Sequence, residues 1–380
     1  RFHLGTNRTA RLLRTHGRRR ATRSCQVQAR RKAIKKQTLW GMAAEDAIPT
    51  IDISPFVDGS SQDDAHQRVV TEIDNACREV GFFYIKGHGV DEGLLEEVHA
   101  GAKAFFQLPL HDKMRIEMAD NKYMGRGYQA VGENVTKGRR DLHEALDVWR
   151  EINDVAALRI PTQHLRTDVV QKMDAFVRGK NQWPDASFEA LYTQYIAQML
   201  KLGDVLVRIM ALALGLAEDA LSSLTDKSFF CLRVIGYPPP EDGASCCVRE
   251  GGDSMQNGVG CGEHTDYGFV TLLNQDDTQS ALQAQTLHGE WVDVTPRKGT
   301  LVVNLGDMLS VWTGGKWRAT PHRVVNRGGQ YRTSVVVFYE PNFDAYITSA
   351  DGAAGGKSEK GVVYGEHVCQ KIATNFSFIS

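Results

Sequence analysis

The sequence predicts a mainly β protein with flanking helices and a sandwich or jelly-roll core. Seven short strand-like segments follow one another between residues 229 and 339, separated by turns that contain Gly, Pro, Asn or Asp. Short strands at this spacing are typical of antiparallel sandwiches and jelly rolls, whereas a parallel sheet needs a helix between successive strands. Before residue 215 the apolar residues recur mainly at helical spacing, which predicts the flanking helices.

Length and composition fit a large folded unit. The chain has 380 residues, of which 42% are hydrophobic and 24% charged, enough for one large domain or two smaller ones. No stretch reaches the roughly 18 uninterrupted apolar residues of a membrane-spanning helix, so no membrane role is expected. The seven cysteines are sparse, odd in number and without a C-x-x-C pair. This usage indicates a reducing compartment, and we expect the cytoplasm.

The first 41 residues differ from the rest of the chain. They hold 13 of the 45 Lys and Arg residues and none of the 46 Asp and Glu residues. Such a segment cannot bury a core, and we expect 1–41 to be disordered or a targeting segment outside the fold. A transit peptide would direct the protein to a plastid or mitochondrion; the alternatives are a nucleic-acid-binding arm and sequence upstream of a start at Met42. The acidic remainder argues against nucleic acid as a partner.

Residues 48–215 are expected to form an N-terminal α/β region. Alternating and helical apolar patterns follow one another at its start and predict strand, helix, strand and helix at 48–53, 66–80, 82–85 and 94–106. The clearest helical pattern runs from 184 to 214, where apolar residues fall on one stripe and Gly215 follows as a C-cap. Glycines interrupt 120–150, and no element is assigned there.

The core is expected to span 225–345. Its strand-like segments are rich in β-branched and aromatic residues, at 229–237, 268–273, 282–285, 291–294, 300–305, 322–325 and 333–339. Residues 238–262 contain three consecutive prolines and many glycines without periodicity, which predicts a loop. The change from helical to stranded character after 215 marks the place for an internal boundary. Residues 346–380 are expected to pack on the core as a C-terminal tail.

Three residues of the core are candidate metal ligands. His264 and Asp266 are two positions apart, and in an extended chain such positions point to the same face. His322 begins another strand 58 positions later, and a sheet folded back on itself would bring it to the same point. Two His and one carboxylate suit a non-haem Fe(II) site with open positions. Zinc with Cys261 as a further ligand, and a purely structural histidine, are the alternatives.

Arg332 and Ser334 lie ten and twelve residues beyond His322. They share one face of a strand, and a guanidinium beside a hydroxyl suits a carboxylate. Because a charge-assisted hydrogen bond contributes about 1.5–3 kcal/mol, such a pair can anchor a small dicarboxylate. A surface pair without a ligand is the alternative.

Further motifs surround these residues. They are Ile-Pro-Thr-Ile-Asp-Ile at 48–53, Gly-Phe-Phe-Tyr-Ile at 81–85, Arg-Val-Ile-Gly-Tyr-Pro-Pro at 233–239, Asn-Leu-Gly-Asp at 304–307 and Phe-Tyr-Glu-Pro at 338–341. In this order and spacing, the set resembles the Fe(II)- and 2-oxoglutarate-dependent dioxygenases of the isopenicillin N synthase type, which include plant hormone and flavonoid oxygenases. The resemblance covers roughly residues 48–375.

This resemblance implies a double-stranded β-helix, the cupin-like form of the jelly roll. It implies Fe(II) on the three candidate ligands, with 2-oxoglutarate as cosubstrate, O2 as oxidant and ascorbate in support. The distal carboxylate of 2-oxoglutarate would meet Arg332 and Ser334, with the Tyr237 hydroxyl as a further contact. Many plant members carry Asn where this chain has Ile235, so part of that hydrogen-bonding pattern differs here.

The resemblance implies a monomeric oxygenase that hydroxylates or desaturates a small organic molecule and releases succinate and CO2. Two alternatives stay open at this point: an iron oxidase or cyclase of the same fold that needs no 2-oxoglutarate, and a metal-free binding protein. An oxygenase acting on nucleic acid is a third. The substrate pocket is expected to involve residues 123–138, the 241–262 loop, Phe338 and the tail after Asn342.

Overall fold

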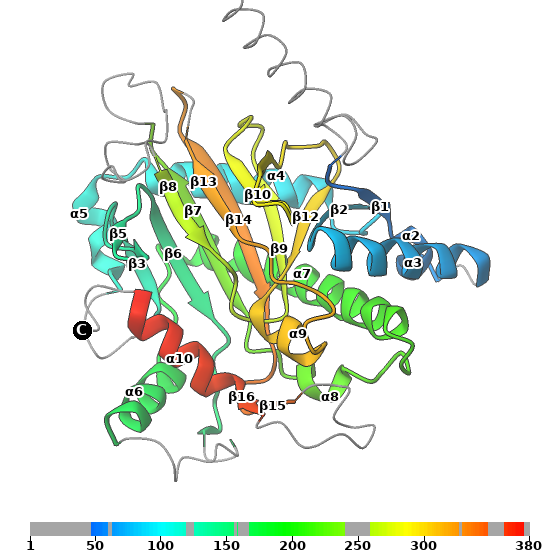
Figure 1. Ribbon diagram of the computed structural model, residues 1–380. Helices are drawn as coiled ribbons and strands as arrows, with labels where there is room; N and C mark the ends of the chain where they lie inside the picture. The colour runs from blue at the N-terminus through cyan, green and yellow to red at the C-terminus, as the bar shows by residue number, and fades with distance from the viewer. Residues whose placement is uncertain are drawn as a thin grey trace, which may run out of the picture. The chain divides into compact units, whose positions relative to one another are not determined.

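The computed structural model of the chain describes residues 47–59, 63–118, 125–155, 158, 167–239, 259–326, 329–348 and 361–375. From Ile48 onward the chain forms one compact unit (Figure 1). The basic segment 1–41, most of the predicted loop at 238–262 and a few residues of 120–150 lie outside the described residues.

The chain is mixed α/β, and its largest element is an eight-stranded sheet with the order β1-β2-β12-β9-β14-β7-β6-β3. All neighbouring strands in this sheet are antiparallel except the parallel pair β1 and β2. In the order of the sheet, the strands are Thr50–Asp52, Phe82–Lys86, Leu301–Leu305, Val270–Gln275, Arg332–Tyr339, Cys231–Tyr237, Glu144–Trp149 and Gly127–Gln129.

A second sheet of four antiparallel strands has the order β11-β10-β13-β8. In that order, its strands are Trp291–Asp293, Leu282–Gln285, His322–Val325 and Val259–His264. From β7 to β14 the chain alternates between the sheets: β7, β9, β12 and β14 belong to the large sheet, and β8, β10, β11 and β13 to the small one. Two short pairs complete the strands: β4 with β5, and β15 with β16, at Val135–Thr136, Arg139–Arg140, Tyr346–Ile347 and Val362–Val363.

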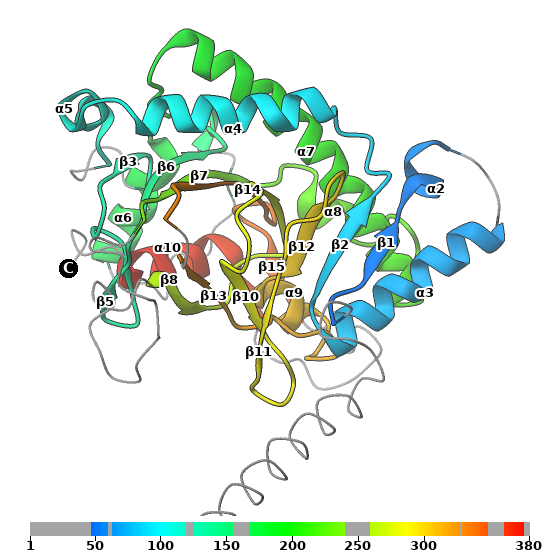
Figure 2. The same ribbon diagram turned by 90° about the horizontal axis from the view of Figure 1, so that it is seen from above.

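Helices cover the face of the large sheet that points away from the small sheet. Figure 2 shows α4 and α7 along one side of β7 and β14, with β8, β13 and β10 on the other. The described helices α2 to α10 span Ser54–Val57, Asp63–Glu79, Glu92–Phe106, Leu110–Lys113, Thr167–Arg178, Ala186–Ala213, Ser222–Thr225, Asp307–Trp312 and Tyr364–Asn375, with a 3-10 turn at Met114–Ile116. Asp185 caps α7 through bonds from the Ser187 and Phe188 amides, and Gly215 follows its end at φ +72°.

Strand β14 connects the helical layer to the interior. Alternate residues point to opposite faces of a strand. On one face Tyr339 donates a hydrogen bond to Asp204 of α7 and Thr333 contacts His99 of α4. The other face therefore points between the two sheets, and it carries Arg332, Ser334, Val336, Phe338 and, just beyond the strand, Glu340.

Most predicted elements of the core are confirmed. Strands β10 and β13 have the expected bounds, and β7, β9, β11, β12, β14 and the helices α3, α4 and α7 differ by only a few residues at their ends. Strand β8 is a correction: residues 259–262 were expected to belong to a loop, but they pair with β13 as part of this strand. The chain contains more helix than a mainly β prediction implies. The unassigned stretch 120–150 forms β6, a fully buried strand of the large sheet. The expected division after 215 falls within one compact unit, because β2 pairs with β12 and β6 pairs with β7.

None of the described helices combines the length and apolarity needed to cross a bilayer.

Close packing of α7 on β14 gives a stability prediction. A Cβ on Gly203 would lie 2.1 Å from Cδ2 of the buried Tyr339 ring. We expect Gly203→Ala to lower the free energy of unfolding by about 1–3 kcal/mol in urea titrations, because the ring cannot retreat. Gly101→Ala is the matched control, since its Cβ would meet the flexible end of Leu191 at 3.2 Å. Equal effects of the two substitutions would contradict this packing.

Candidate metal centre and cosubstrate pocket

A cavity between the two sheets contains every candidate site residue. It is lined by His264, Asp266 and His322, and also by Arg332, Ser334 and Tyr237. The large sheet supplies its wall through the inward faces of β6, β7, β9 and β14, and the small sheet supplies β8 and β13.

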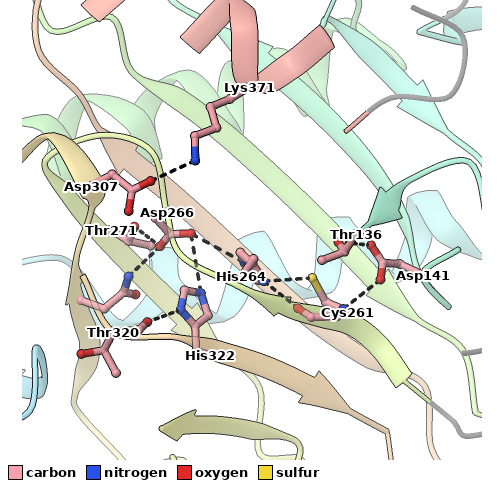
Figure 3. A network of polar contacts seen from close by, with 12 residues as sticks. Thr136, Asp141, Cys261, His264, Asp266, Thr271, Asp307, Thr320, His322 and Lys371 are labelled. Atoms are coloured by element: carbon pink, nitrogen blue, oxygen red, sulfur yellow. Dashed lines mark hydrogen bonds and ion pairs between the residues drawn. The ribbon is translucent and has the colours of Figure 1, made fainter. Parts of the chain in front are cut away.

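The three candidate metal ligands converge on one point (Figure 3). His264 ends β8 and His322 begins β13, and the two are paired directly across these strands. Asp266 lies in the turn after β8 and not within a strand, so the turn, rather than the pleat, aims its carboxylate. The Nε2 atoms of His264 and His322 lie 3.7 and 3.6 Å from Asp266 Oδ1.

Backbone carbonyls fix the orientation of both imidazoles. His264 Nδ1 donates to the Gly262 carbonyl at 2.8 Å, and His322 Nδ1 donates to the Thr320 carbonyl at 3.0 Å. A carbonyl oxygen only accepts, so the proton of each ring lies on Nδ1. Each Nε2 therefore faces Asp266, and in the neutral ring it offers its lone pair to a metal.

The carboxylate of Asp266 is held in a similar way. Its Oδ2 accepts hydrogen bonds from Thr271 Oγ1 at 2.5 Å and from Asn304 Nδ2 at 2.6 Å, which leaves Oδ1 toward the two imidazoles. Burial opposes ionisation, but the two histidines and these hydrogen bonds hold the pKa of Asp266 below its usual range. The carboxylate is thus ionised, and its Oδ1 faces the two imidazoles, which is the state that binds a cation.

The two histidines differ in charge without a metal. Burial and the neighbouring His264 lower the pKa of His322 to about 4, so this ring is neutral at physiological pH. Burial would also lower the pKa of His264, but Cys261 and Asp266 raise it to about 10. A proton on His264 therefore offsets the buried charge of Asp266, and a bound cation would take over that role.

The donor set fits Fe(II). Two neutral imidazole nitrogens and one carboxylate oxygen form the arrangement of non-haem iron oxygenases, with positions open for further ligands. Cys261 does not join it, because its Sγ lies 3.6 Å from Nδ1 of His264, on the side of the ring away from Asp266. The zinc alternative therefore lacks its fourth ligand among the described residues near this point.

A second group of potential ligands, Asp141, His143 and Cys261, lies nearby. Its donor atoms already have partners within the protein. Asp141 accepts from Asn134, Thr136 and the Gly262 amide. His143 Nδ1 bonds to the Gly260 carbonyl, and the Arg233 guanidinium lies 3.3 Å from Nε2, where a cation would be repelled. This group connects β8 to the neighbouring loop.

Arg332 and Ser334 form the other half of the site. Arg332 is 1% exposed and Ser334 2% exposed. Within the described residues, Arg332 Nε and Nη1 and Ser334 Oγ have no hydrogen-bond partner. The Tyr237 ring lies opposite on β7, with its centroid 4.8 Å from Arg332 Cζ. Buried donors of this kind are costly unless a ligand satisfies them, and a carboxylate is the ligand that fits a guanidinium and a hydroxyl.

Several functional residues escaped the sequence analysis. Thr271 and Asn304 orient Asp266, and no pattern singles them out, although Asn304 belongs to a motif that the resemblance rests on. The cavity also contains the buried acids Asp147 and Glu340 and the half-buried guanidinium of Arg233. Of the expected substrate pocket, Asn134, Thr136, Cys261, Phe338 and Tyr364 line the cavity. Most of the 241–262 loop lies outside the described part of the chain.

Two family models match the chain. The model described as "non-haem dioxygenase in morphine synthesis N-terminal" matches residues 48–186, and the model described as "2OG-Fe(II) oxygenase superfamily" matches residues 229–341. The second match contains all six candidate site residues.

The chain is also similar to curated proteins and to solved structures. It is 41% identical to a homoarginine-6-hydroxylase from Glycine max over 87% of this chain and 97% of that protein. Its identity to a homoarginine-6-hydroxylase from Oryza sativa subsp. japonica is 43%, over 87% and 98%. The crystal structure of a full-length Neurospora crassa protein in complex with alpha-KG matches with a TM-score of 0.70 at 26% identity, covering 86% of this chain and 96% of that one.

Proposed function

Since this chain belongs to the 2OG-Fe(II) oxygenase superfamily, we propose that it is a hydroxylase of a small guanidinium-bearing amino acid, with homoarginine as the first candidate. It is a 2-oxoglutarate-dependent dioxygenase by family. The substrate is the part that we infer. Its support is the identity of 41–43% to homoarginine-6-hydroxylases over 87% of this chain.

The metal would bind to His264, Asp266 and His322. The protein prepares this site by fixing both Nδ1 protons on carbonyls and by occupying Asp266 Oδ2 with two hydrogen bonds. Partners of this kind set the tautomer and direction of each ligand, so less order is lost when the ion binds.

The observation that carries the cosubstrate proposal is the buried guanidinium of Arg332, with two nitrogen donors that no described residue satisfies. The distal carboxylate of 2-oxoglutarate would accept from Arg332 and Ser334 at this end of the cavity. The 2-oxo acid end would then point along the β14 face toward the metal ligands. This arrangement favours the 2-oxoglutarate-dependent reaction over an oxidase that needs no cosubstrate.

Bound iron and 2-oxoglutarate supply the oxidising chemistry. Overall, 2-oxoglutarate and O2 yield succinate and CO2, and one oxygen atom enters a C–H bond of the substrate as a hydroxyl group. The residues of this chain bind and orient the reactants and limit the access of water: the cavity lies between the two sheets, and its apolar wall includes Phe82, Leu273 and Val336. Hydroxylation is preferred to desaturation because the named relatives are hydroxylases.

We also propose that the two sheets form a double-stranded β-helix, supported by the way the chain passes back and forth between them from β7 to β14, with β10 and β11 as a hairpin in the small sheet. In this view 225–345 is the catalytic core, 48–215 and the 346–380 tail support it, and 1–41 is a separate segment. A reducing compartment such as the cytoplasm is supported by the described cysteines, which are free thiols.

The test is turnover by the purified chain with Fe(II), ascorbate, 2-oxoglutarate and homoarginine. We expect succinate to form in equal amount to a product that is heavier than homoarginine by one oxygen atom, as measured by mass spectrometry. Omitting 2-oxoglutarate should abolish the product. A product that forms at full rate without 2-oxoglutarate would instead support the cosubstrate-independent oxidase, and absence of iron binding would support the metal-free binding protein.

A further inference from the structure

The cavity continues beyond the cosubstrate end, and its wall there carries charge. Strand pairing places Asp147 of β6 beside Arg233 of β7, and Arg233 beside Val336 of β14. Phe338 lies two residues after Val336 on β14, and Glu340 lies two residues after Phe338. Because these residues share the inward face with Arg332, the cavity is basic at one end and acidic toward the other.

Asp147 is a buried carboxylate with spare acceptor capacity. It is 2% exposed, and its Oδ2 lies 3.4 Å from Arg233 Nη1. Its Oδ1 has no hydrogen-bond partner in the part of the chain that the structure describes. Burial raises the pKa of Asp147 to about 6. A buried carboxylate oxygen without a partner can accept a hydrogen bond from a donor group of a ligand.

Arg233 is held beside Asp147 mainly by neutral groups. Its Nη2 lies 3.1 Å from Gln129 Oε1 and 3.3 Å from His143 Nε2. Burial lowers the pKa of His143 to about 4, so this ring accepts and carries no charge. Asp147 and Arg233 therefore present one negative and one positive group side by side, which matches the ammonium and carboxylate of an α-amino acid.

Glu340 is the second buried acid of this wall. It is 4% exposed, and burial raises the pKa of its carboxyl to about 8. The acidic Asp266 and Asp307 lie near it and raise its pKa further, whereas the Tyr364 hydroxyl and the Phe269 amide lower it. Its Oε2 has no hydrogen-bond partner within the described residues. A buried carboxyl in acidic surroundings would be stabilised by a cationic ligand.

We propose that this wall recognises an α-amino acid with a cationic side chain, the head group at Asp147 and Arg233 and the guanidinium or ammonium group at Glu340. Strand spacings put the Cα atoms of Asp147 and Glu340 roughly 16 Å apart, and both side chains line the cavity. Asp266, which contacts Thr271 of the adjacent strand β9, then lies near the guanidinium end. The inference rests on the proposed function and adds the residues that select the substrate.

The experiment measures ligand binding, not turnover. Protein loaded with Fe(II) and 2-oxoglutarate is titrated without O2 in a calorimeter with three ligands. Homoarginine is compared with homocitrulline, which replaces the guanidinium by a neutral group of the same shape, and with 6-guanidinohexanoate, which lacks the α-amino group. Each comparison removes one proposed contact.

We expect the parent to bind homoarginine roughly 10- to 100-fold more tightly than either analogue, as the loss of one charge-assisted contact requires. Glu340→Gln should lose the preference over homocitrulline and keep the preference over 6-guanidinohexanoate. Asp147→Asn should do the reverse. Asp174→Asn is the control, since Asp174 is an exposed acid on α6 paired with Arg178, and it should match the parent.

The inference would be overturned if Glu340→Gln and Asp147→Asn both kept the ligand preferences of the parent. It would also be overturned if the parent bound 2-oxoglutarate but bound homoarginine no more tightly than the two analogues. Unchanged preferences in the variants leave the proposed homoarginine hydroxylation intact, because that proposal is tested by product and succinate formation. A parent without any preference would count against homoarginine as the substrate as well, while 2-oxoglutarate binding would still support the oxygenase. If Asp147→Asn does not fold, as judged by circular dichroism, Asp147→Ser takes its place in the same titration.

Discussion

Asp266→Ala is expected to reduce iron-dependent turnover by at least about 1000-fold. The substitution removes one of three ligands and leaves the Thr271 hydroxyl and the Asn304 amide without their acceptor. Losing a residue that only orients a ligand typically costs 10- to 100-fold, and losing the ligand itself should cost more. The measurement is succinate formation together with the iron content of the purified variant.

Glu263→Gln is the matched control, because Glu263 is a neighbouring carboxylate that is exposed and paired with Lys137. It should keep both iron and turnover. Thr271→Val should fall between the two, because Asp266 then keeps the Asn304 hydrogen bond and loses the other. If Asp266→Ala retained the iron content of the parent, Asp266 would not be a ligand, and the metal would bind elsewhere.

Arg332→Leu is expected to raise the KM for 2-oxoglutarate by roughly 100-fold or more. The variant removes the buried donors that the distal carboxylate would satisfy, and each charge-assisted hydrogen bond contributes about 1.5–3 kcal/mol. The effect should depend on that carboxylate. A 2-oxo acid of similar length that lacks the distal carboxylate should therefore have the same KM with the variant and with the parent. The measurement is decarboxylation of each 2-oxo acid at varied concentration.

Arg208→Leu serves as the control for Arg332→Leu, because Arg208 is an exposed residue of α7 paired with Glu218. It should leave the KM unchanged. If Arg332→Leu also left the KM unchanged, the distal carboxylate would lie elsewhere in the cavity, and the unsatisfied guanidinium would need another ligand.

The sequence predicts those parts of the site that depend on local pattern. His264 and Asp266 are near neighbours, and strand-like residues surround His322, so all three stand out as candidates, although Asp266 lies in a turn and not on the predicted strand face. The partnership of His264 with His322 needs the direct pairing of β8 with β13, which no local pattern shows. The expectation of a sheet folded back on itself made His322 a candidate, and the resemblance to known oxygenases supports that choice.

Residues whose role depends on register were not predictable in this way. Asp147 matters because β6 pairs with β7 at Arg233, and β6 lies in a stretch where surrounding glycines conceal its strand. Glu340 stands in a motif without apparent chemistry until β14 turns its alternate residues inward. Thr271 and Asn304 act only because β9 and β12 place them side by side. These roles depend on strand pairing and register in the tertiary structure, which the periodicity of the sequence does not reveal.

We propose that one cavity holds Fe(II) on the two histidines and Asp266, with 2-oxoglutarate between that metal and Arg332. A crystal structure grown without O2 from protein, Fe(II) and 2-oxoglutarate tests it most directly, with iron located by its anomalous scattering. The predicted result is one iron peak bounded by Nε2 of His264, Oδ1 of Asp266 and Nε2 of His322, and a cosubstrate carboxylate on Arg332 and Ser334. Iron at the Asp141, His143 and Cys261 group, or an empty Arg332 pocket beside bound 2-oxoglutarate, would contradict it.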